Sequence, residues 1–259
     1  MGWFILGGIL AVGTLFWSTL NIVGLLAHEE YPTTEETFAA TSVRSLDVAT
    51  DNGSITVIAD EPGEAKSDAG GIVVSTEVGE GLRPTKVSQR VVDGVLELRG
   101  TCPGLNSPWC HVDFTIRLPA DRPVHVDADN GSVVVEGVSA PVDVDNDNGR
   151  IDLVRVSGDI SVTNDNGRIA GTALTAATVR SDNDNGSIEL SFTTAPSLVL
   201  ATNDNGSITV AVPDDRESYR VDIRTDNGSS DNGVRTDPAS DRVIDLSTSN
   251  GSVRLRPSD

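Results

Sequence analysis

The stretch VDVDNDNGRIDL, residues 142–153, contains the pattern that decides the fold of this chain. Its centre, Asn-Asp-Asn-Gly, occurs four times, at residues 146–149, 164–167, 183–186 and 203–206. Shorter versions that keep Asn-Gly extend the series, so the turn glycines are Gly131, Gly149, Gly167, Gly186, Gly206, Gly228 and Gly251, at steps of 18, 18, 19, 20, 22 and 23 residues. A recurring period of this length is typical of repeat architectures.

Apolar and polar residues alternate on both sides of each Asn-Gly. The fifth and seventh residues before the glycine are usually apolar, as Val144 and Val142 are before Gly149. The second and fourth residues after it are apolar as well, as Ile151 and Leu153 are. A period of two indicates half-buried strands, and Asn-Gly is a strong turn signal. Each repeat is therefore predicted to supply two short strands joined at an Asn-Gly corner.

Two all-β architectures fit this pattern: a meander of hairpins, or a parallel β-solenoid of about 18–23-residue repeats in which each repeat is one coil. A meander needs a second layer, and no stretch after residue 27 has the apolar stripe of a helix that could provide it. We favour the solenoid, in which corner Asn and Asp residues would stack in ladders. Outside the main repeat, residues 89–98 are predicted to form a hairpin around Asp93-Gly94, and residues 112–118 a further strand.

The amino-terminal part is predicted to be a transmembrane anchor over residues 1–27, followed by a polar stem, 28–44, and the β-repeat domain, 45–258. The run from Trp3 to Leu26 has 24 residues without a charge, enough to cross a hydrocarbon core that needs about 20. A cleaved signal peptide is the alternative, but no Lys or Arg precedes the apolar run. Acidic residues follow the run, which favours an inside amino terminus and an extracytoplasmic domain in the cell membrane.

The composition restricts the partners of this domain. The net charge is -20 and the pI is about 4.3, so the surface should repel the phosphates of nucleic acids, and no nucleic acid is expected as a partner. The expected partners are the membrane that holds the anchor and an envelope protein or a cell-surface partner.

The two cysteines of the chain, Cys102 and Cys110, are predicted to form a disulfide, which suits an oxidising compartment. Two free thiols are the alternative. A metal site is less well supported because His111 is the one imidazole nearby. Trp109 lies in this loop, which also contains two prolines, and we expect it to be exposed as a contact residue, or else to cap the open end of the core.

The residue two places before each turn glycine is nearly always Asp. Stacked in register, such carboxylates would lie about 4.8 Å apart and repel one another. Arg150 and Arg168 could neutralise two of the corners, and solvent with corner amides the rest. The alternative is weak binding of divalent cations, Ca²⁺ above all, by oxygen ligands. The candidate calcium ligands are Asp129, Asp147, Asp165, Asp184 and Asp204.

The repeats resemble those of a bacterial family named putative adhesin, the toast-rack-like β-solenoid proteins of cell envelopes. The resemblance rests on Asn-Gly-Ser-Ile/Val, as at 52–55, 130–133, 185–188 and 205–208, and on Cys102 to Cys110 followed by the strand of residues 112–119. It covers about residues 43–258 and implies a surface-exposed, often tethered β-solenoid. The heavy Asp loading of the corners departs from the family pattern.

No enzyme is predicted. The Asp residues recur in every repeat, whereas a catalytic site is a local break in regularity. The histidines, His28, His111 and His125, lie in no nucleophile motif. Residues 225–233 do break the pattern, because Asp-Asn-Gly is doubled there and Ser230 replaces an apolar residue. We interpret this segment as either a loosened coil or a binding loop. The sequence thus predicts a non-catalytic adhesion, interaction or scaffold module of the envelope; the alternative is an envelope-stress sensor that binds a regulatory partner.

Overall fold

The computed structural model describes residues 29–30, 33–60, 71–80, 83–103, 109–213 and 216–258. Within these ranges the chain is all β apart from one short 3-10 helix, η1 (Ala40–Ser42). The strands are β1 (Glu29–Glu30), β2 (Thr34–Ala39), β3 (Ser45–Asn52), β4 (Ile55–Asp60), β5 (Gly71–Glu80), β6 (Lys86–Val92), β7 (Val95–Thr101), β8 (His111–Pro119), β9 (Val124–Glu136), β10 (Val142–Val154), β11 (Ile160–Leu174), β12 (Thr178–Phe192), β13 (Leu198–Val212), β14 (Arg220–Asn232) and β15 (Val243–Pro257).

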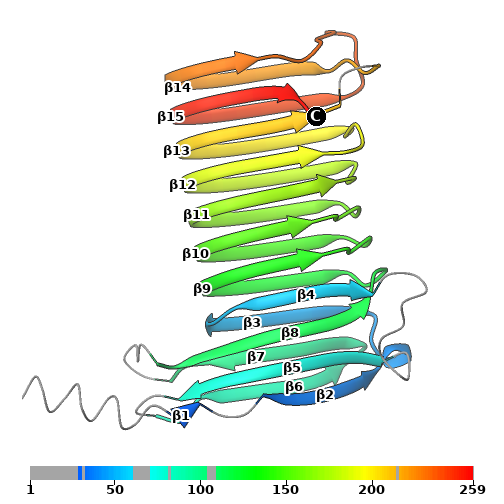
Figure 1. Ribbon diagram of the computed structural model, residues 1–259, viewed down its shortest axis with the longest axis vertical. Coiled ribbons are helices and arrows are strands. Elements are labelled where there is room, and N and C mark those ends of the chain that lie inside the picture. The colour runs from blue at the N-terminus through cyan, green and yellow to red at the C-terminus, as the bar shows by residue number, and fades with distance from the viewer. Residues whose placement is uncertain are drawn as a thin grey trace, which may run out of the picture.

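Strands β9 to β13 form a stack of parallel strands in register. Each pairs with the next at equivalent repeat positions, so that Val142 lies opposite Val124 on one side and Ile160 on the other. Each long strand bends back at its Asn-Gly, and its two halves lie on two faces of the stack (Figure 1). The largely parallel sheet is consistent with the predicted β-solenoid, and the hairpin meander is excluded for this part of the chain.

The corner requires glycine. Gly149 has φ of 145°, a backbone conformation that a residue with a side chain rarely adopts. A Cβ atom there would lie 1.8 Å from the carbonyl oxygen of Gly131 on the preceding coil. The repeated glycine therefore lets the corners of successive coils stack in contact.

The core lies between the two halves of each strand. In β10, Val142 and Val144 from the first half and Ile151 and Leu153 from the second are at most 1% exposed. Burial of one such side chain contributes about 1.5–3 kcal/mol. Because neighbouring coils from β9 to β13 and β15 place mainly aliphatic residues at these positions, the core is a continuous, largely aliphatic column along the stack.

The amino-terminal part of the described chain departs from the parallel pattern. Strands β6 and β7 form the predicted hairpin, with positive φ at Asp93 and Gly94, and β8 is the predicted strand after the disulfide loop. Strand β2 pairs antiparallel with β5, which also pairs antiparallel with β8. Residues 34–39 of the predicted stem thus belong to the sheet, because their backbone groups are satisfied by β5 rather than by solvent.

The last two coils are stacked out of sequence order. Strand β15 pairs with β13 on one side and with β14 on the other, so β14 is the outermost coil. In β15, Ile244, Leu246, Val253 and Leu255 are at most 1% exposed, whereas no residue of β14 is fully buried. The more apolar strand takes the inner position because it has neighbours on both sides there. The irregular segment 225–233 therefore lies mostly in the outermost coil.

The predicted anchor, residues 1–27, lies outside the described residues. In the part of the chain that the structure describes, no helix is long and apolar enough to span a membrane.

Candidate functional site

The corner of the stack presents a ladder of exposed asparagines. The side-chain amide of Asn148 donates to the Oδ1 atom of Asn130 at 3.3 Å, and that of Asn166 donates to Asn148 at 3.1 Å. The same hydrogen bond, with each side-chain amide donating to the Asn of the preceding coil in the stack, continues at 3.0 to 3.2 Å through Asn185, Asn205, Asn250 and Asn227. The predicted Asn ladder is confirmed, and it runs the whole length of the regular stack.

A second ladder lies inside the corner. Asn146, Asn164, Asn183 and Asn203, the first residue of each Asn-Asp-Asn-Gly, are at most 3% exposed. With the amides oriented to satisfy their neighbours, Asn146 donates to the carbonyl of Ala128 at 3.0 Å and accepts from the backbone N–H of Gly149 at 3.3 Å. Sequence reasoning missed this burial. The signal was present, because the residue three places before the glycine continues the period of the apolar, inward positions.

The predicted calcium ligands lie where the stacking pattern places them. Asp129, Asp147, Asp165, Asp184 and Asp204 are all exposed at the same place in the corners of β9 to β13. Among the described residues, no three acidic, histidine or cysteine side chains form a group that could hold a metal ion. Calcium binding by this column therefore stays a prediction.

Two carboxyl groups of the acidic surface, those of Asp129 and Asp182, have raised pKa values. Asp129 is exposed as a residue, but neighbouring atoms cover part of its carboxyl. This partial burial raises the pKa of the Asp129 carboxyl, and the charges of Asp51, Asp147 and Asp127 raise it further. Burial likewise raises the pKa of Asp182, together with the charges of Asp184 and Asp204, against an opposing backbone hydrogen bond from Asn183. Both carboxyls give up their proton less readily than an isolated Asp.

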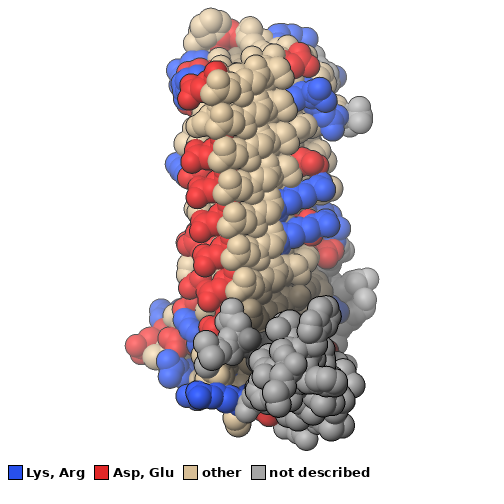
Figure 2. Space-filling view, turned by 90° about the vertical axis from the view of Figure 1, so that its left-hand side faces the viewer, with Lys and Arg blue, Asp and Glu red and all other residues tan. Residues whose placement is uncertain are grey.

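The basic residues of the repeats do not neutralise the Asp column. Arg150 forms an ion pair with Asp152 at 2.6 Å, and Arg168 forms one with Glu189, also at 2.6 Å. Both partners lie after the corner, on the second half of a strand, which corrects the expectation that these arginines serve the corner carboxylates. Figure 2 shows the result: a stripe of acidic side chains on one side of the corner and basic side chains on the other.

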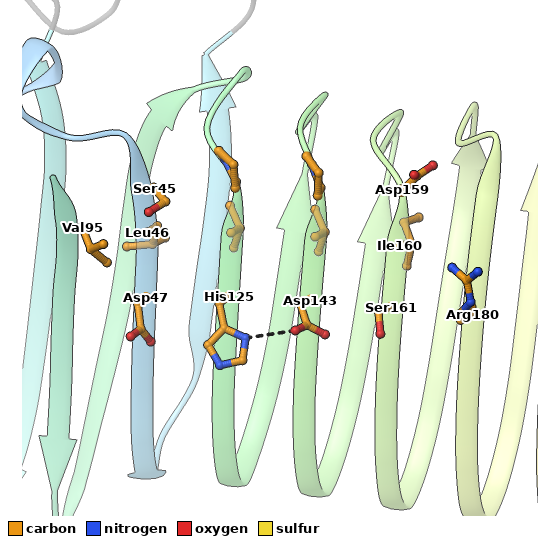
Figure 3. A pocket seen from close by; sticks show the side chains of 14 residues that line it. Ser45, Leu46, Asp47, Val95, His125, Asp143, Asp159, Ile160, Ser161 and Arg180 are labelled. Carbon is orange, nitrogen blue, oxygen red and sulfur yellow. Dashed lines mark ion pairs between the residues drawn. The ribbon is translucent and has the colours of Figure 1, made fainter. Parts of the chain in front are cut away.

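A groove of about 440 Å³ crosses the beginnings of β3, β9, β10 and β11. Its lining includes Pro123, His125, Asp143, Asp159 and Arg180 (Figure 3). The Nδ1 atom of His125 lies 3.4 Å from a carboxylate oxygen of Asp143, and both side chains are about half exposed.

The order of residues in this groove does not suit nucleophilic catalysis. The register places Asp143 between His125 and Ser161 on three neighbouring strands. A serine nucleophile needs the histidine in contact with its hydroxyl and the carboxylate behind the histidine. Here the carboxylate takes the middle place, and His125 is a partly exposed residue of β9.

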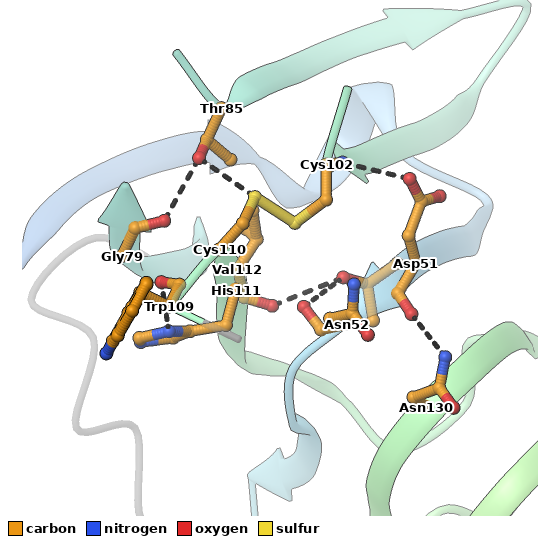
Figure 4. The surroundings of a disulfide bond; sticks show 11 residues. Asp51, Asn52, Gly79, Thr85, Cys102, Trp109, Cys110, His111, Val112 and Asn130 are labelled. Atoms are coloured by element: carbon orange, nitrogen blue, oxygen red, sulfur yellow. Dashed lines mark hydrogen bonds between the residues drawn. A yellow bond between two sulfur atoms is a disulfide. The ribbon is translucent and has the colours of Figure 1, made fainter. Parts of the chain in front are cut away.

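The predicted disulfide between Cys102 and Cys110 is present. It joins the end of β7 to the start of β8 (Figure 4). The carboxylate of Asp51 accepts a hydrogen bond from the backbone N–H of Cys102 at 2.9 Å, and the Asp51 carbonyl accepts one from the side chain of Asn130 at 3.2 Å. Asp51, two residues before Gly53, therefore links the disulfide to Asn130 in the first corner of the stack.

Trp109 is half-buried, between the two expectations of an exposed contact residue and a cap on the core. Its carbonyl oxygen lies 3.2 Å from Nδ1 of His111, and the ring of His111 lies against Gly79 of β5 (Figure 4). Trp109 thus sits beside the antiparallel part of the sheet, and its role as a contact residue stays a prediction.

No family model matches the chain, and no curated protein matches it in sequence. Solved structures are similar to it in fold. One is described as a putative cell adhesion protein from Clostridium sporogenes, with 12% identity and a TM-score of 0.41, covering 88% of this chain and 99% of that one. Another is described as a putative adhesin from Bacteroides fragilis, with 13% identity and a TM-score of 0.34, covering 88% and 97%. A third, a putative adhesin from Parabacteroides distasonis, has 13% identity and a TM-score of 0.25, covering 86% and 97%.

Proposed function

We propose that this chain is a membrane-tethered, extracytoplasmic β-solenoid that acts as a non-catalytic adhesion or interaction module of the cell envelope. The observation that carries the proposal is the register of β9 to β13, β15 and β14. It places outward side chains in straight columns over a single rigid stack. Such a surface suits contact with a large partner rather than enclosure of a small substrate.

Two features of the chain support the location. The uncharged run from Trp3 to Leu26 is long enough to hold the domain at a membrane. The disulfide between Cys102 and Cys110 suits an oxidising compartment. The strongly acidic surface directs contacts toward basic or self-complementary protein surfaces and away from anionic lipid and nucleic acid.

Protease treatment of intact spheroplasts that carry the full chain tests the location. We expect the β-repeat domain to be digested without lysis, with a cytoplasmic protein as the control for intact membranes. Protection of the domain until the membrane is lysed would contradict the orientation.

Retention of the same cells on surfaces coated with envelope proteins, or with sister cells, tests the adhesive role. We expect retention to fall when the domain has been removed by protease, relative to cells without the chain treated in the same way. Equal loss from both kinds of cell would mean that other proteins carry the adhesion.

A further inference from the structure

Strand β14 ends the stack with an open edge. Its backbone pairs with β15 on one side. On the other side, the one contact in the described chain is the bridge between Tyr219 and Thr236, just before the strand begins. The backbone N–H of Arg220 donates to the carbonyl of Arg242, on the β15 side. The backbone N–H of Tyr219 donates to the carbonyl of Arg235, on the opposite side. Because backbone groups alternate sides along a strand, those of Val221, Ile223 and Thr225 point away from the stack.

The core is also open at this end. Val221 and Ile223 pack against the aliphatic core but remain only half-buried, unlike the equivalent Ile244 and Leu246 of β15, which are fully buried. A further strand laid along β14 would cover both side chains and pair the free backbone groups.

The outward side chains of β14 alternate in charge: Arg220, Asp222, Arg224 and Asp226 are all exposed. A second β14 laid antiparallel, with Ile223 opposite its own copy, places Arg220 opposite Asp226 and Asp222 opposite Arg224. Sliding this pairing by two residues either way brings Asp222 opposite Asp222 or Arg224 opposite Arg224. Opposite charges across a strand pair stabilise it and like charges destabilise it, so one register is selected.

We propose that β14 is a homophilic docking strand, through which two copies of this chain join tip to tip by antiparallel pairing of residues 220–226. The pairing is isologous, since each copy contributes the same strand about a two-fold axis. The segment at Thr236 covers the edge only at Tyr219, outside the paired residues.

The position of β14 gives this contact a direction. The strand lies at the opposite end of the stack from β1 (Figure 1). This step rests on the proposed function: a chain held at a membrane by its amino-terminal run presents β14 away from that membrane. The second copy then belongs to a facing surface. A short edge contact of this kind is weak singly and gains strength from many copies on each surface.

Charge exchange on β14 tests the pairing with the full chain in detergent, by sedimentation equilibrium. Asp222→Arg and Arg224→Asp each put like charges opposite one another, and each should weaken self-association by about tenfold or more, since two cross-strand pairs change sign. Within one chain, Arg224 also forms ion pairs with Asp222 and Asp245, and both variants lose the pair between residues 222 and 224. An equimolar mixture of the two variants nevertheless restores every opposite-charge pair between the two docking strands, and should associate as the wild type does. The double variant should associate with itself for the same reason.

Two further variants make the result specific to the edge. Asp145→Arg on β10 makes the same change in net charge on an exposed side of the stack, and should associate as the wild type does. Ile223→Pro removes an outward N–H without touching the β15 side and should abolish association. Circular dichroism checks that every variant is folded. Monomeric wild type, or loss of association in the single variants without recovery in their mixture, overturns the proposal, as does open-ended growth instead of dimers.

An assay with vesicles that carry the full chain distinguishes failure of the β14 pairing from failure of the proposed adhesive function. Vesicles with Asp222→Arg and vesicles with Arg224→Asp should each stay dispersed and should cluster when mixed, as measured by light scattering. Association of the mixed variants in detergent without clustering of vesicles would retain the β14 pairing and overturn adhesion between facing membranes. Absence of association in detergent would overturn the pairing and leave adhesion to other partners standing.

Discussion

The side-chain amides of Asn146 and Asn164 lie 2.8 Å apart inside the corner, on neighbouring coils of the stack. In the orientation that satisfies both atoms, the Asn164 amide donates to the carbonyl of Asn146 at 2.9 Å and accepts from the N–H of Gly167 at 3.2 Å. The buried asparagine therefore provides hydrogen bonds that the bent backbone cannot make with itself. This need for hydrogen bonds explains why the inward position holds Asn or Thr in every coil from β10 to β15, whereas β9 has Ala128 there.

Replacement of Asn164 by alanine should therefore be costly. The change leaves the N–H of Gly167 and the carbonyl of Asn146 without their partner in a buried corner, at a cost of about 1–3 kcal/mol in the free energy of unfolding. The matched control is Asn166→Ala, two residues along, whose side chain is exposed and whose groups water can satisfy. Urea unfolding of both variants measures the difference, and equal losses would contradict the role of the inner ladder.

The disulfide should stabilise the antiparallel end of the sheet. Cys102 and Cys110 are separated by 8 residues, and closing so short a loop contributes about 2–3 kcal/mol through the unfolded state. Mass spectrometry of unreduced peptides should recover the linked pair. The double variant Cys102→Ser/Cys110→Ser should unfold at a lower urea concentration than the oxidised wild type. It should unfold at the same urea concentration as the reduced wild type. Recovery of both thiols alkylated without reductant would refute the bond.

Asp182 should destabilise the folded protein at neutral pH. Burial and the charges of Asp184 and Asp204 raise its pKa above the ordinary value of 3.8, so the folded state binds its proton more tightly than the unfolded state does. Its contribution to stability therefore falls as the pH rises from 3.8 through the folded-state pKa.

Asp182→Asn should accordingly raise the melting temperature at pH 7, and the gain should vanish below the unfolded-state pKa, where Asp182 is neutral in both states. Thr202→Asn, at the paired position on β13, changes no charge and serves as the control. A gain that is the same at all pH values would mean that packing rather than charge is responsible.

Calcium binding by the corner Asp column, from Asp129 to Asp204, is tested by melting the protein in millimolar CaCl₂ and in NaCl of equal ionic strength. Coordination by carboxylate and carbonyl oxygens predicts a larger rise with Ca²⁺ than with NaCl. Asp165→Asn, at the middle of the column, should reduce the excess. Equal shifts in the two salts would mean that the ions only screen the repulsion among these carboxylates.

The sequence by itself determined the repeat and its corner. Gly149 and its equivalents mark a backbone conformation that only glycine adopts readily, and alternation such as Val142 and Val144 marks which side chains face inward. Both are local properties, so they can be read along the chain. The sequence also limited the possible partner of Cys102 to Cys110, because the chain has no other cysteine, and the structure shows that the two are bonded.

Only the tertiary structure decided the features that depend on which strands become neighbours. Strand β15 lies inside β14, against sequence order, because the more apolar strand gains most from a neighbour on each side. Arg168 pairs with Glu189 and not with a corner Asp, because register places Glu189 one coil away on the same face. Strand β2 joins the sheet because β5 offers it an edge, which residues 34–39 do not reveal. These outcomes depend on which of several distant segments pairs with a given strand edge and covers a given part of the core. A local sequence pattern carries no information about that choice.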